Sequence, residues 1–294
     1  MAADLHTHST FSDGTTTPTR NAELAAHAGL RALALTDHDT TEGWSEAAAG
    51  CAAHGLEFVP GLELSTEWDG RSVHLLGFWV DPGHPGLAAE CARLRDERFE
   101  RARRMVGRLV ELGLPLSMEA VEARAGRAPI GRPHVAAAMV EAGVVPDLQA
   151  AFDRYLAEGR PAYVPKHALD PEQGAHLLIA SGGVAVLAHP GPTFPAEHTG
   201  RWSREARNTL RLIDRLTAAG LAGLEADHSA HDPATALLWR RVAARRGLLV
   251  TGGSDFHGDA KDVKIGQRAT DAEGLEALRQ RARTGMRAQG GPAW

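Results

Sequence analysis

The stretch ADLHTHSTFSDGTTTP (residues 3–18) separates His6 from His8 by a single residue and places Asp13 five residues after the second histidine. A lone histidine at the end of a strand is more often a hydrogen-bonded structural residue than a metal ligand. The interpretation of this pair therefore depends on which side chains the rest of the chain brings to it.

Apolar runs and amphipathic stretches alternate along much of the chain. Short apolar runs bounded by turn residues are typical of buried strands. They are RALALTDHD (31–39), LEFVPGLELS (56–65), SVHLLGFWV (72–80), GVAVLAHP (183–190), LAGLEAD (221–227) and GLLVTGGSDFH (247–257). Amphipathic stretches such as TRNAELAAHAG (19–29) and PATALLWRRVAARRG (233–247) end at a glycine, as helices often do. This alternation predicts strand–helix units and a mainly parallel α/β sheet or barrel.

The middle of the chain lacks this alternation. An Arg-, Glu- and Ala-rich helical pattern begins near residue 85, and GLPLS (113–117), GRAPIGRPH (126–134) and GVVPD (143–147) divide it into four helical segments. The mixed charges of its first segment favour a solvated helix face over a nucleic-acid contact. We interpret residues 85–165 as a helical insert between two parts of a barrel, residues 1–84 and 166–294. We expect the insert to act as a lid that measures substrate length.

Histidines and carboxylates follow the predicted strands, and the carboxyl ends of strands in a parallel barrel share one face. They are His6 and His8, Asp37, His38 and Asp39, Glu63, His189, and Asp255 and His257, with His74 inside the run VHLLGF. Burying such a group would be costly unless a metal ion neutralised it. Imidazole and carboxylate ligands without a thiolate suit Zn, Mn or Fe. We therefore expect a metal site whose first ligands are His6 and His8.

The composition limits the classes of partner. The chain of 294 residues has a formal charge of −5 and a pI of about 6.3, which offers no overall basic surface for long nucleic acid. Cys51 and Cys91 lack the spacing of a disulfide or metal motif. We find no signal segment and no apolar run of the ~20 residues that cross a membrane, so we expect a cytoplasmic protein without a membrane partner.

Six ordered motifs resemble those of the PHP (polymerase and histidinol phosphatase) family. They are DLHTHSTFSDG, LALTDHDTTEG, PGLELST, VHLLGF, VAVLAHPG and TGGSDFHG. The resemblance covers nearly the whole chain. It implies an α/β fold, a distorted (β/α)7 PHP barrel with a helical insertion domain, and a site for two or three metal ions at the carboxyl ends of the strands.

Within the family, the chain is most similar to stand-alone nucleotide phosphoesterases, which include nucleoside 3′,5′-bisphosphate phosphatases and 5′-to-3′ exoribonucleases. That branch carries a GRPHVA-type segment in its insert, as IGRPHVAAAMVEAG (130–143) does here. In histidinol phosphatases the position of Asp13 is usually a histidine. One departure is LEADHSAHD (224–232), where relatives often have a tyrosine-containing aromatic stretch, and this departure leaves the base preference open.

The resemblance also implies the metal ligands. His6, His8, Glu63 and Asp255 would hold one ion. Glu63, His74 and His189 would hold a second. Asp13, His38 and His257 would hold a third. Asp37 and Asp39 would orient neighbouring imidazoles or cap the helix that follows DTTEG (39–43). The candidate catalytic residues are Asp37, His228 and His257.

Hydrolysis of a phosphate ester needs a nucleophile and neutralisation of the phosphoryl oxygens. Two metal ions about 3.5–4 Å apart can hold a hydroxide between them, and in-line attack by this hydroxide is expected. A second phosphate on the substrate needs its own cationic contacts, which guanidinium and ammonium groups suit. The candidates for phosphate binding are Arg132, His134, Lys166 and Ser229. Arg132 could instead form a pair on the surface of the insert.

Together these observations predict a metal-dependent phosphatase that removes the 3′-phosphate of nucleoside 3′,5′-bisphosphates and also trims short RNA from the 5′ end. Manganese is the preferred metal by resemblance, with zinc or iron as alternatives. The expected partner is a small phosphorylated nucleotide or a short RNA end, not stable duplex nucleic acid. The alternatives are a phosphatase for another metabolite, such as a histidinol-phosphate-like compound or a sugar phosphate, a non-catalytic metal-stabilised PHP module, and amide hydrolysis by the same metal chemistry.

Overall fold

The computed structural model describes residues 2–126, 129–165, 168–193 and 204–289. The chain divides into two compact units, a barrel unit (residues 1–89 and 169–294) and an insert (residues 90–168). The predicted phosphate-binding residue Lys166 lies outside the described residues. Within the described part of the chain, we find no helix with the length and apolar character needed to span a membrane.

The strands of the barrel unit form one seven-stranded sheet in sequence order. They are β1 (Ala3–Asp4), β2 (Ala32–Leu35), β3 (Glu57–Trp68), β4 (Arg71–Phe78), β5 (Val184–Leu187), β6 (Gly223–His228) and β7 (Leu249–Gly253). Backbone hydrogen bonds between the segments that follow β1 and β7 nearly close the sheet. The N–H of Asp255 donates to the carbonyl of His6 at 2.8 Å, and the N–H of His8 donates to Phe256 at 2.9 Å. The expected seven-stranded α/β barrel is confirmed.

One strand runs against the others. The β3–β4 and β4–β5 pairs are antiparallel, whereas the other four pairs are parallel. Asp69 and Gly70 both have positive φ and form the two-residue turn between β3 and β4, as expected of an Asp-Gly hairpin. Because β4 is reversed, its first half lies beside the second half of β3, and His74 pairs with Ser65. The reversal brings a histidine from inside a strand to the barrel end where Glu63 lies.

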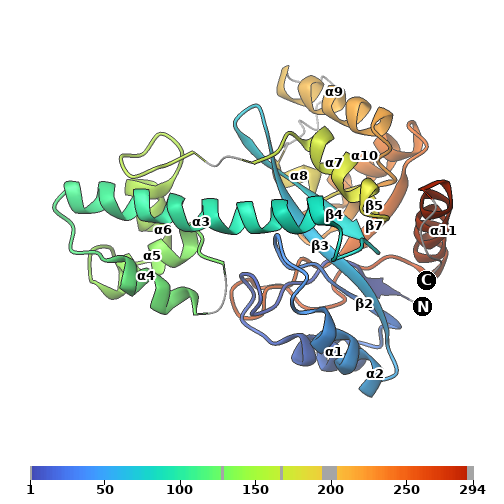
Figure 1. Ribbon diagram of the computed structural model, residues 1–294, viewed down its shortest axis with the longest axis horizontal. Coiled ribbons are helices and arrows are strands. Elements are labelled where there is room, and N and C mark those ends of the chain that lie inside the picture. Colours follow the sequence, from blue (N-terminus) through green and yellow to red (C-terminus); the bar gives the residue numbers. More distant parts are fainter. Residues whose placement is uncertain (1, 127–128, 166–167, 194–203, 290–294) are drawn as a thin grey trace. The chain divides into compact units, whose positions relative to one another are not determined.

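Helices of the barrel unit lie outside the strands (Figure 1). They are α1 (Pro18–His27), α2 (Trp44–Ala53), α7 (Pro171–Ala180), α8 (Pro190–Thr193), α9 (Arg204–Ala218), α10 (Pro233–Ala244) and α11 (Ala272–Gln289). Thr17, Asp170 and Asp232 cap α1, α7 and α10 by accepting backbone N–H groups, and each is followed by proline. These helices therefore begin where their sequences favour a helix start.

The strands are apolar because both of their faces are buried. On β2, Leu33 packs with Ala22 of α1 and Cys51 of α2, whereas Ala34 belongs to a second cluster with Leu76 and other strand residues. A strand that is covered on both faces has a nearly continuous run of apolar residues in its sequence. Polar side chains can therefore gather mainly where the strands end, and this arrangement positions the site.

The insert has its own helices and its own core. The helical segments are α3 (Pro85–Glu111), α4 (Met118–Ala125), α5 (Arg132–Glu141) and α6 (Leu148–Ala151), and α6 continues into a π-helical turn over Phe152–Leu156. Met105, Leu109, Val121, Val135 and Met139 are buried together. The insert thus has the apolar interior of a small independent helical unit.

Replacing Gly253 by alanine should destabilise the barrel beneath the site. A Cβ atom there would lie 2.3 Å from Cβ of His6 and 2.7 Å from its backbone nitrogen. Backbone atoms in a nearly closed sheet cannot move aside freely, so we expect the free energy of unfolding to fall by about 1–3 kcal/mol. The control is Gly107→Ala on α3, where nothing lies within 4 Å and stability should rise by up to about 1 kcal/mol. Urea unfolding of both variants checks this, and equal midpoints would contradict it.

Candidate metal centre

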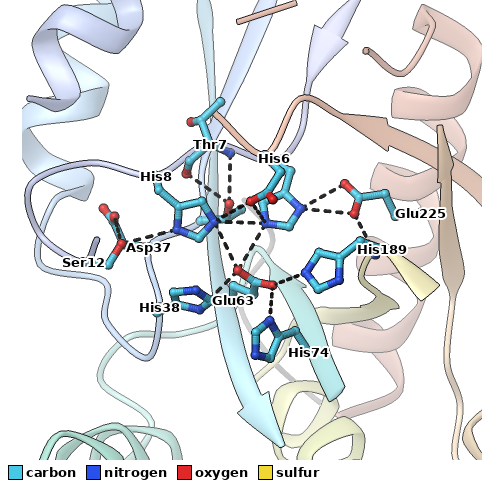
Figure 2. Close-up of polar contacts among 12 residues, drawn as sticks. His6, Thr7, His8, Ser12, Asp37, His38, Glu63, His74, His189 and Glu225 are labelled. Atoms are coloured by element: carbon cyan, nitrogen blue, oxygen red, sulfur yellow. Dashed lines mark hydrogen bonds and ion pairs between the residues drawn. The ribbon is translucent and has the colours of Figure 1, made fainter. Parts of the chain in front are cut away.

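Glu63 lies at the centre of the site, and its two carboxylate oxygens divide five histidines between them (Figure 2). Oε2 lies 3.1–3.2 Å from ring nitrogens of His6, His8 and His38. Oε1 lies 2.8 Å from ring nitrogens of His74 and His189. A carboxylate shared in this way can bridge two metal ions.

The charge of Glu63 is set by these neighbours. Its side chain is 1% exposed, and this burial alone would raise the pKa of the carboxyl group. The surrounding imidazoles, chiefly His38, His74 and His6, outweigh burial and hold the pKa of Glu63 well below its usual range. Glu63 therefore carries a negative charge, which suits a position between two cations.

Asp255 completes a group around His6 and His8. Its Oδ1 atom lies 3.4 Å from Nε2 of His6 and 3.3 Å from Nε2 of His8. One ligand atom from each of these three residues and from Glu63 lies within 4.8 Å of all the others. The structure thus brings together the four residues that the resemblance implies for one ion.

Asp13 belongs to a second compact group. Its Oδ1 atom lies 3.2 Å from Nε2 of His257 and 3.6 Å from Nδ1 of His8, and its Oδ2 atom lies 3.7 Å from Nε2 of His38. Burial would raise the pKa of Asp13, but the histidines, His38 foremost, hold it well below its usual range. The structure brings Asp13, His38 and His257 together and adds His8 to them.

The remaining predicted group, Glu63, His74 and His189, is less compact than the other two. His74 and His189 both contact Oε1 of Glu63, but the compact set of ligand atoms consists of His38, Glu63 and His74. His189 has φ of 23° and Asp255 has φ of 56°, both in the left-handed region. Such conformations cost about 1–3 kcal/mol each and persist only where neighbours hold them. His189 and Asp255, both candidate ligands, are thus held in strained backbone conformations at the strand ends.

The sequence reasoning missed Glu225, which is fully buried on β6. Its Oε1 atom lies 3.0 Å from Nδ1 of His6, and its Oε2 atom accepts the backbone N–H of His189 at 2.9 Å (Figure 2). A ligating histidine is commonly held by a carboxylate on its other ring nitrogen, and Glu225 has this place behind His6. Glu225 also forms a compact group with His6 and His228. The sequence did contain an indication of this role, because a glutamate between Leu224 and Ala226 in a buried strand needs a partner for its charge.

Asp37 and Asp39 lie behind the ligands. Asp37 accepts the N–H and hydroxyl of Ser9, both at 2.7 Å, and the hydroxyl of Ser12 at 2.5 Å. Oγ of Ser12 lies 3.3 Å from Nδ1 of His8. Asp39 accepts the N–H of Ser65 at 2.7 Å. The expectation that these aspartates cap the next helix is wrong, because α2 begins after Gly43 and has no side-chain cap.

A cavity of about 620 Å³ opens over the ligand cluster. Its lining residues are Asp13, His38, Glu63, His74, His189, His228, Ser229, Ala230, Asp255, His257, Lys261, Asp262 and Val263. Two candidate catalytic residues, His228 and His257, and the candidate phosphate ligand Ser229 are thus in reach of a bound molecule. Asp37 is not among the lining residues, and its geometry suits positioning Ser12 and His8 rather than contact with substrate.

The donor set of the site fits divalent metal ions. Nδ1 of His38 and Nε2 of His228 are buried without a hydrogen bond from any described residue, although each has a carboxylate oxygen within 3.4 Å. Nδ1 of His38 is suited to donate its lone pair to a cation beside Glu63. Nδ1 of His228 instead accepts the backbone N–H of Ala230 at 3.0 Å, so Nε2 of a neutral His228 carries the proton and faces Asp255. Crowded imidazole and carboxylate ligands without thiolate are typical of Zn, Mn and Fe sites.

The insert carries a separate basic cluster. The guanidinium of Arg132 lies 5.9 Å from the ring centre of Phe152 and 6.0 Å from that of Tyr163, and the guanidinium of Arg101 lies 5.9 Å from Tyr163. Burial and the nearby Arg132 lower the pKa of Arg101 to about 10. Among the described residues, no carboxylate forms an ion pair with either arginine. Arg101 also donates its Nε–H to the carbonyl of Val164 at 2.8 Å, which leaves its terminal N–H groups and the guanidinium of Arg132 as candidates for binding an anion.

His134 has a local role at the start of α5. Its Nδ1 atom accepts the backbone N–H of Gly131 at 3.0 Å, which satisfies a helix-terminal group. This contact accounts for one ring nitrogen of this candidate phosphate ligand. Arg132 forms no ion pair with a described carboxylate, and its contacts within the insert are with the rings of Phe152 and Tyr163.

Comparison with known proteins identifies the family of the chain. The family model for the PHP domain matches residues 4–112. A 3′,5′-nucleoside bisphosphate phosphatase from Chromobacterium violaceum is 37% identical over 255 residues, which are 86% of each chain. The 5′-3′ exoribonuclease Rnm of Escherichia coli is 30% identical over 94% of this chain and 92% of its own. The solved structure of a candidate metal-dependent phosphoesterase from Bifidobacterium adolescentis has a TM-score of 0.83 and 35% identity, covering 95% and 96% of the two chains.

The fold, the histidine–carboxylate cluster and these relatives define a metal-dependent phosphoesterase. The chain belongs to the PHP family.

Proposed function

We propose that this phosphoesterase removes the 3′-phosphate of nucleoside 3′,5′-bisphosphates. The observation that carries the proposal is the ligand cluster around Glu63, present in a chain that is 37% identical to a phosphatase of this substrate class. Two or three divalent ions, manganese by preference, would be the cofactors. Their ligands would be His6, His8, Asp13, His38, Glu63, His74, His189, Asp255 and His257.

Different residues of the chain would have different roles in the reaction. When bound, the ions supply the positive charge that activates water and neutralises phosphoryl oxygens. His228 lines the cavity and is not among the proposed metal ligands, so it can hold a proton at Nε2 and deliver it to the leaving oxygen. His257 also lines the cavity, but its Nδ1–H donates to the carbonyl of Asp255 and its Nε2 faces Asp13, which suits a metal ligand rather than a proton donor. Ser229 can donate its hydroxyl to a phosphoryl oxygen. Asp37 fixes Ser12 and thereby the orientation of His8.

The second phosphate needs cationic contacts away from the metal ligands. Arg132 is the main candidate, and Arg101 joins it because both guanidinium groups share the ring of Tyr163 without a carboxylate partner among the described residues. Guanidinium groups bind phosphate through paired N–H donors. The rings of Tyr163 and Phe152 hold these guanidinium groups, which themselves present flat faces on which a nucleobase can stack. Lys166 and His134 remain candidates, and the insert would act as a lid over a substrate of limited length.

Trimming of short RNA from the 5′ end is a second candidate activity. Two observations favour it: the similarity to the exoribonuclease of Escherichia coli over 94% of this chain, and the basic and aromatic cluster, which can take a backbone phosphate as readily as a terminal one.

Rates of phosphate release from three substrates test the proposal. Adenosine 3′,5′-bisphosphate should be hydrolysed at least about tenfold faster than 5′-AMP or a sugar phosphate, because only the bisphosphate places a second phosphate on a charged contact. Arg132→Met should raise KM for the bisphosphate by about tenfold or more without changing the sugar phosphate rate.

The control is Arg124→Met, since Arg124 lies on the same insert and pairs with exposed Glu141. Equal turnover of all three substrates would contradict the assignment, and efficient 5′ trimming of oligoribonucleotides with little release from the bisphosphate would favour the second candidate.

A further inference from the structure

Lys261 lies in the loop after β7 and contacts the metal centre from outside the ligand set. Its Nζ atom donates a hydrogen bond to Oδ2 of Asp255 at 2.6 Å. The lysine side chain is 43% exposed, and that of Asp255 is 11% exposed. Lys261 therefore reaches the edge of a buried cluster while its ammonium group stays accessible from the cavity that it lines.

The two oxygens of Asp255 have different surroundings. Oδ1 lies 3.4 Å or less from Nε2 of His6 and of His8, in the group where an ion would bind. Oδ2 faces Lys261 and lies 3.4 Å from Nε2 of His228. Asp255 can thus hold an ion through one oxygen and the ammonium group through the other. The ammonium group would then lie next to the ion without competing for its place.

The charges around the cavity give this ammonium group a function. The carboxylates of Asp13, Glu63, Asp255 and Asp262 line the cavity, and each repels an entering phosphate group. Among the described lining residues, Lys261 is the one side chain with an ammonium or guanidinium group. A phosphoryl group bound over the ligand cluster would lie in a cavity where, among the described lining residues, Lys261 alone carries a permanent positive charge.

An ammonium group also has the right number of donors. It carries three N–H bonds, and Asp255 accepts one of them. The other two can be donated to phosphoryl oxygens, and charge-assisted bonds of this kind are among the stronger ones in proteins. If the pair with Asp255 were only a stabilising contact, this partly exposed ion pair would add little to folding stability and nothing to phosphate binding.

We propose that Lys261 is a substrate-binding residue of the phosphoesterase site. Asp255 holds the ammonium group of Lys261 in place, and this ammonium group donates hydrogen bonds to the phosphoryl group of the substrate. The proposal rests on phosphoester hydrolysis by this family and not on the nucleotide substrate. It adds to the site a residue that lies outside the His and carboxylate motifs.

Lys261→Met tests the proposal, because methionine keeps much of the length and removes the charge. For p-nitrophenyl phosphate, kcat/KM should fall about 10- to 100-fold, and the inhibition constant of inorganic phosphate should rise by a similar factor. The number of manganese ions per chain, measured by mass spectrometry of the metal, should stay unchanged. Lys261→Arg should recover part of the loss. Lys264→Met, an exposed lysine of the same loop, is the matched control and should match the wild-type protein in all three measurements.

Two outcomes would overturn the proposal. One is an unchanged inhibition constant for phosphate, measured by calorimetry if turnover is too slow. The other is a loss of metal from Lys261→Met that accounts for the whole loss of activity, which would make Lys261 a support for Asp255 alone. If the wild-type protein cleaves p-nitrophenyl phosphate but not nucleoside bisphosphates, the proposed substrate fails and the test of Lys261 still stands.

Discussion

Glu63→Gln should reduce phosphoesterase activity on the order of 10³-fold, which corresponds to about 4 kcal/mol of transition-state stabilisation. Both carboxylate oxygens of Glu63 contact histidines: Oε2 contacts three of them and Oε1 contacts two. A glutamine amide has one oxygen to offer and no negative charge, so it cannot bridge two ions. Metal analysis should show at least one fewer ion per chain, and a phosphate-release assay gives the loss of rate.

The matched control is Glu57→Gln on the same strand, where Glu57 pairs with Arg279 at the surface. An exposed pair of this kind contributes at most about 1 kcal/mol to stability, so metal content and activity should remain near those of the wild-type protein. A Glu63→Gln variant with full metal content and a rate within tenfold of the wild-type rate would show that Glu63 does not bridge.

Removing the metal should lower the melting temperature by about 10 °C or more at neutral pH. Each ion at 100 times its dissociation constant stabilises the folded state by about 2.7 kcal/mol. In a chain of this size 1 kcal/mol shifts the melting temperature by roughly 1.5–2 °C, so two or three ions together account for about 10 °C. Calorimetry of chelated and manganese-loaded protein measures the difference.

The size of this difference should depend on pH. Burial opposes protonation of His8, but Asp255 and Glu63 raise the pKa of His8 in the metal-free protein to about 9. At pH 7 an incoming ion must therefore displace a proton, and metal affinity should increase with pH. The same proton stabilises the metal-free fold fully below pH 6.5, and this contribution is lost as the pH rises through about 9.

The gap between the two melting temperatures should thus widen from pH 6 to pH 9 and close in acid. A gap that is constant across this range would contradict proton-coupled binding, and Gly107→Ala should show the same pH dependence as the wild-type protein.

The barrel and most of the ligand cluster could be predicted because parallel strands leave polar residues at one end. His6, His38 and His189 lie two or three residues after the ends of β1, β2 and β5, so position near a strand end was enough to group them. His74 lies inside β4 and reaches the same end only because the Asp69–Gly70 hairpin reverses that strand. Its place came from the family resemblance and not from the general pattern.

Other parts of the site could not be predicted because local patterns do not report three-dimensional contacts. Glu225 resembles one polar residue in a core strand, and only the closing of the barrel brings it to His6. Lys261 lies in an irregular loop without periodicity, and its contact with Asp255 depends on how that loop folds back. Asp39 lies where a helix cap would be expected, but α2 begins only after Gly43. The carboxylate of Asp39 accepts the backbone N–H of Ser65 instead.

The cluster around Glu63 should bind the metal ions on which hydrolysis of a phosphate ester by this protein depends. The most direct test is inorganic phosphate released from adenosine 3′,5′-bisphosphate by protein that is first chelated and then titrated with manganese. We expect no release from the chelated protein, and a rate that rises with bound metal and levels off at two or three ions per chain. Release that persists in fully chelated protein, or metal-loaded protein that releases no phosphate from this or any other phosphate ester, would contradict the account.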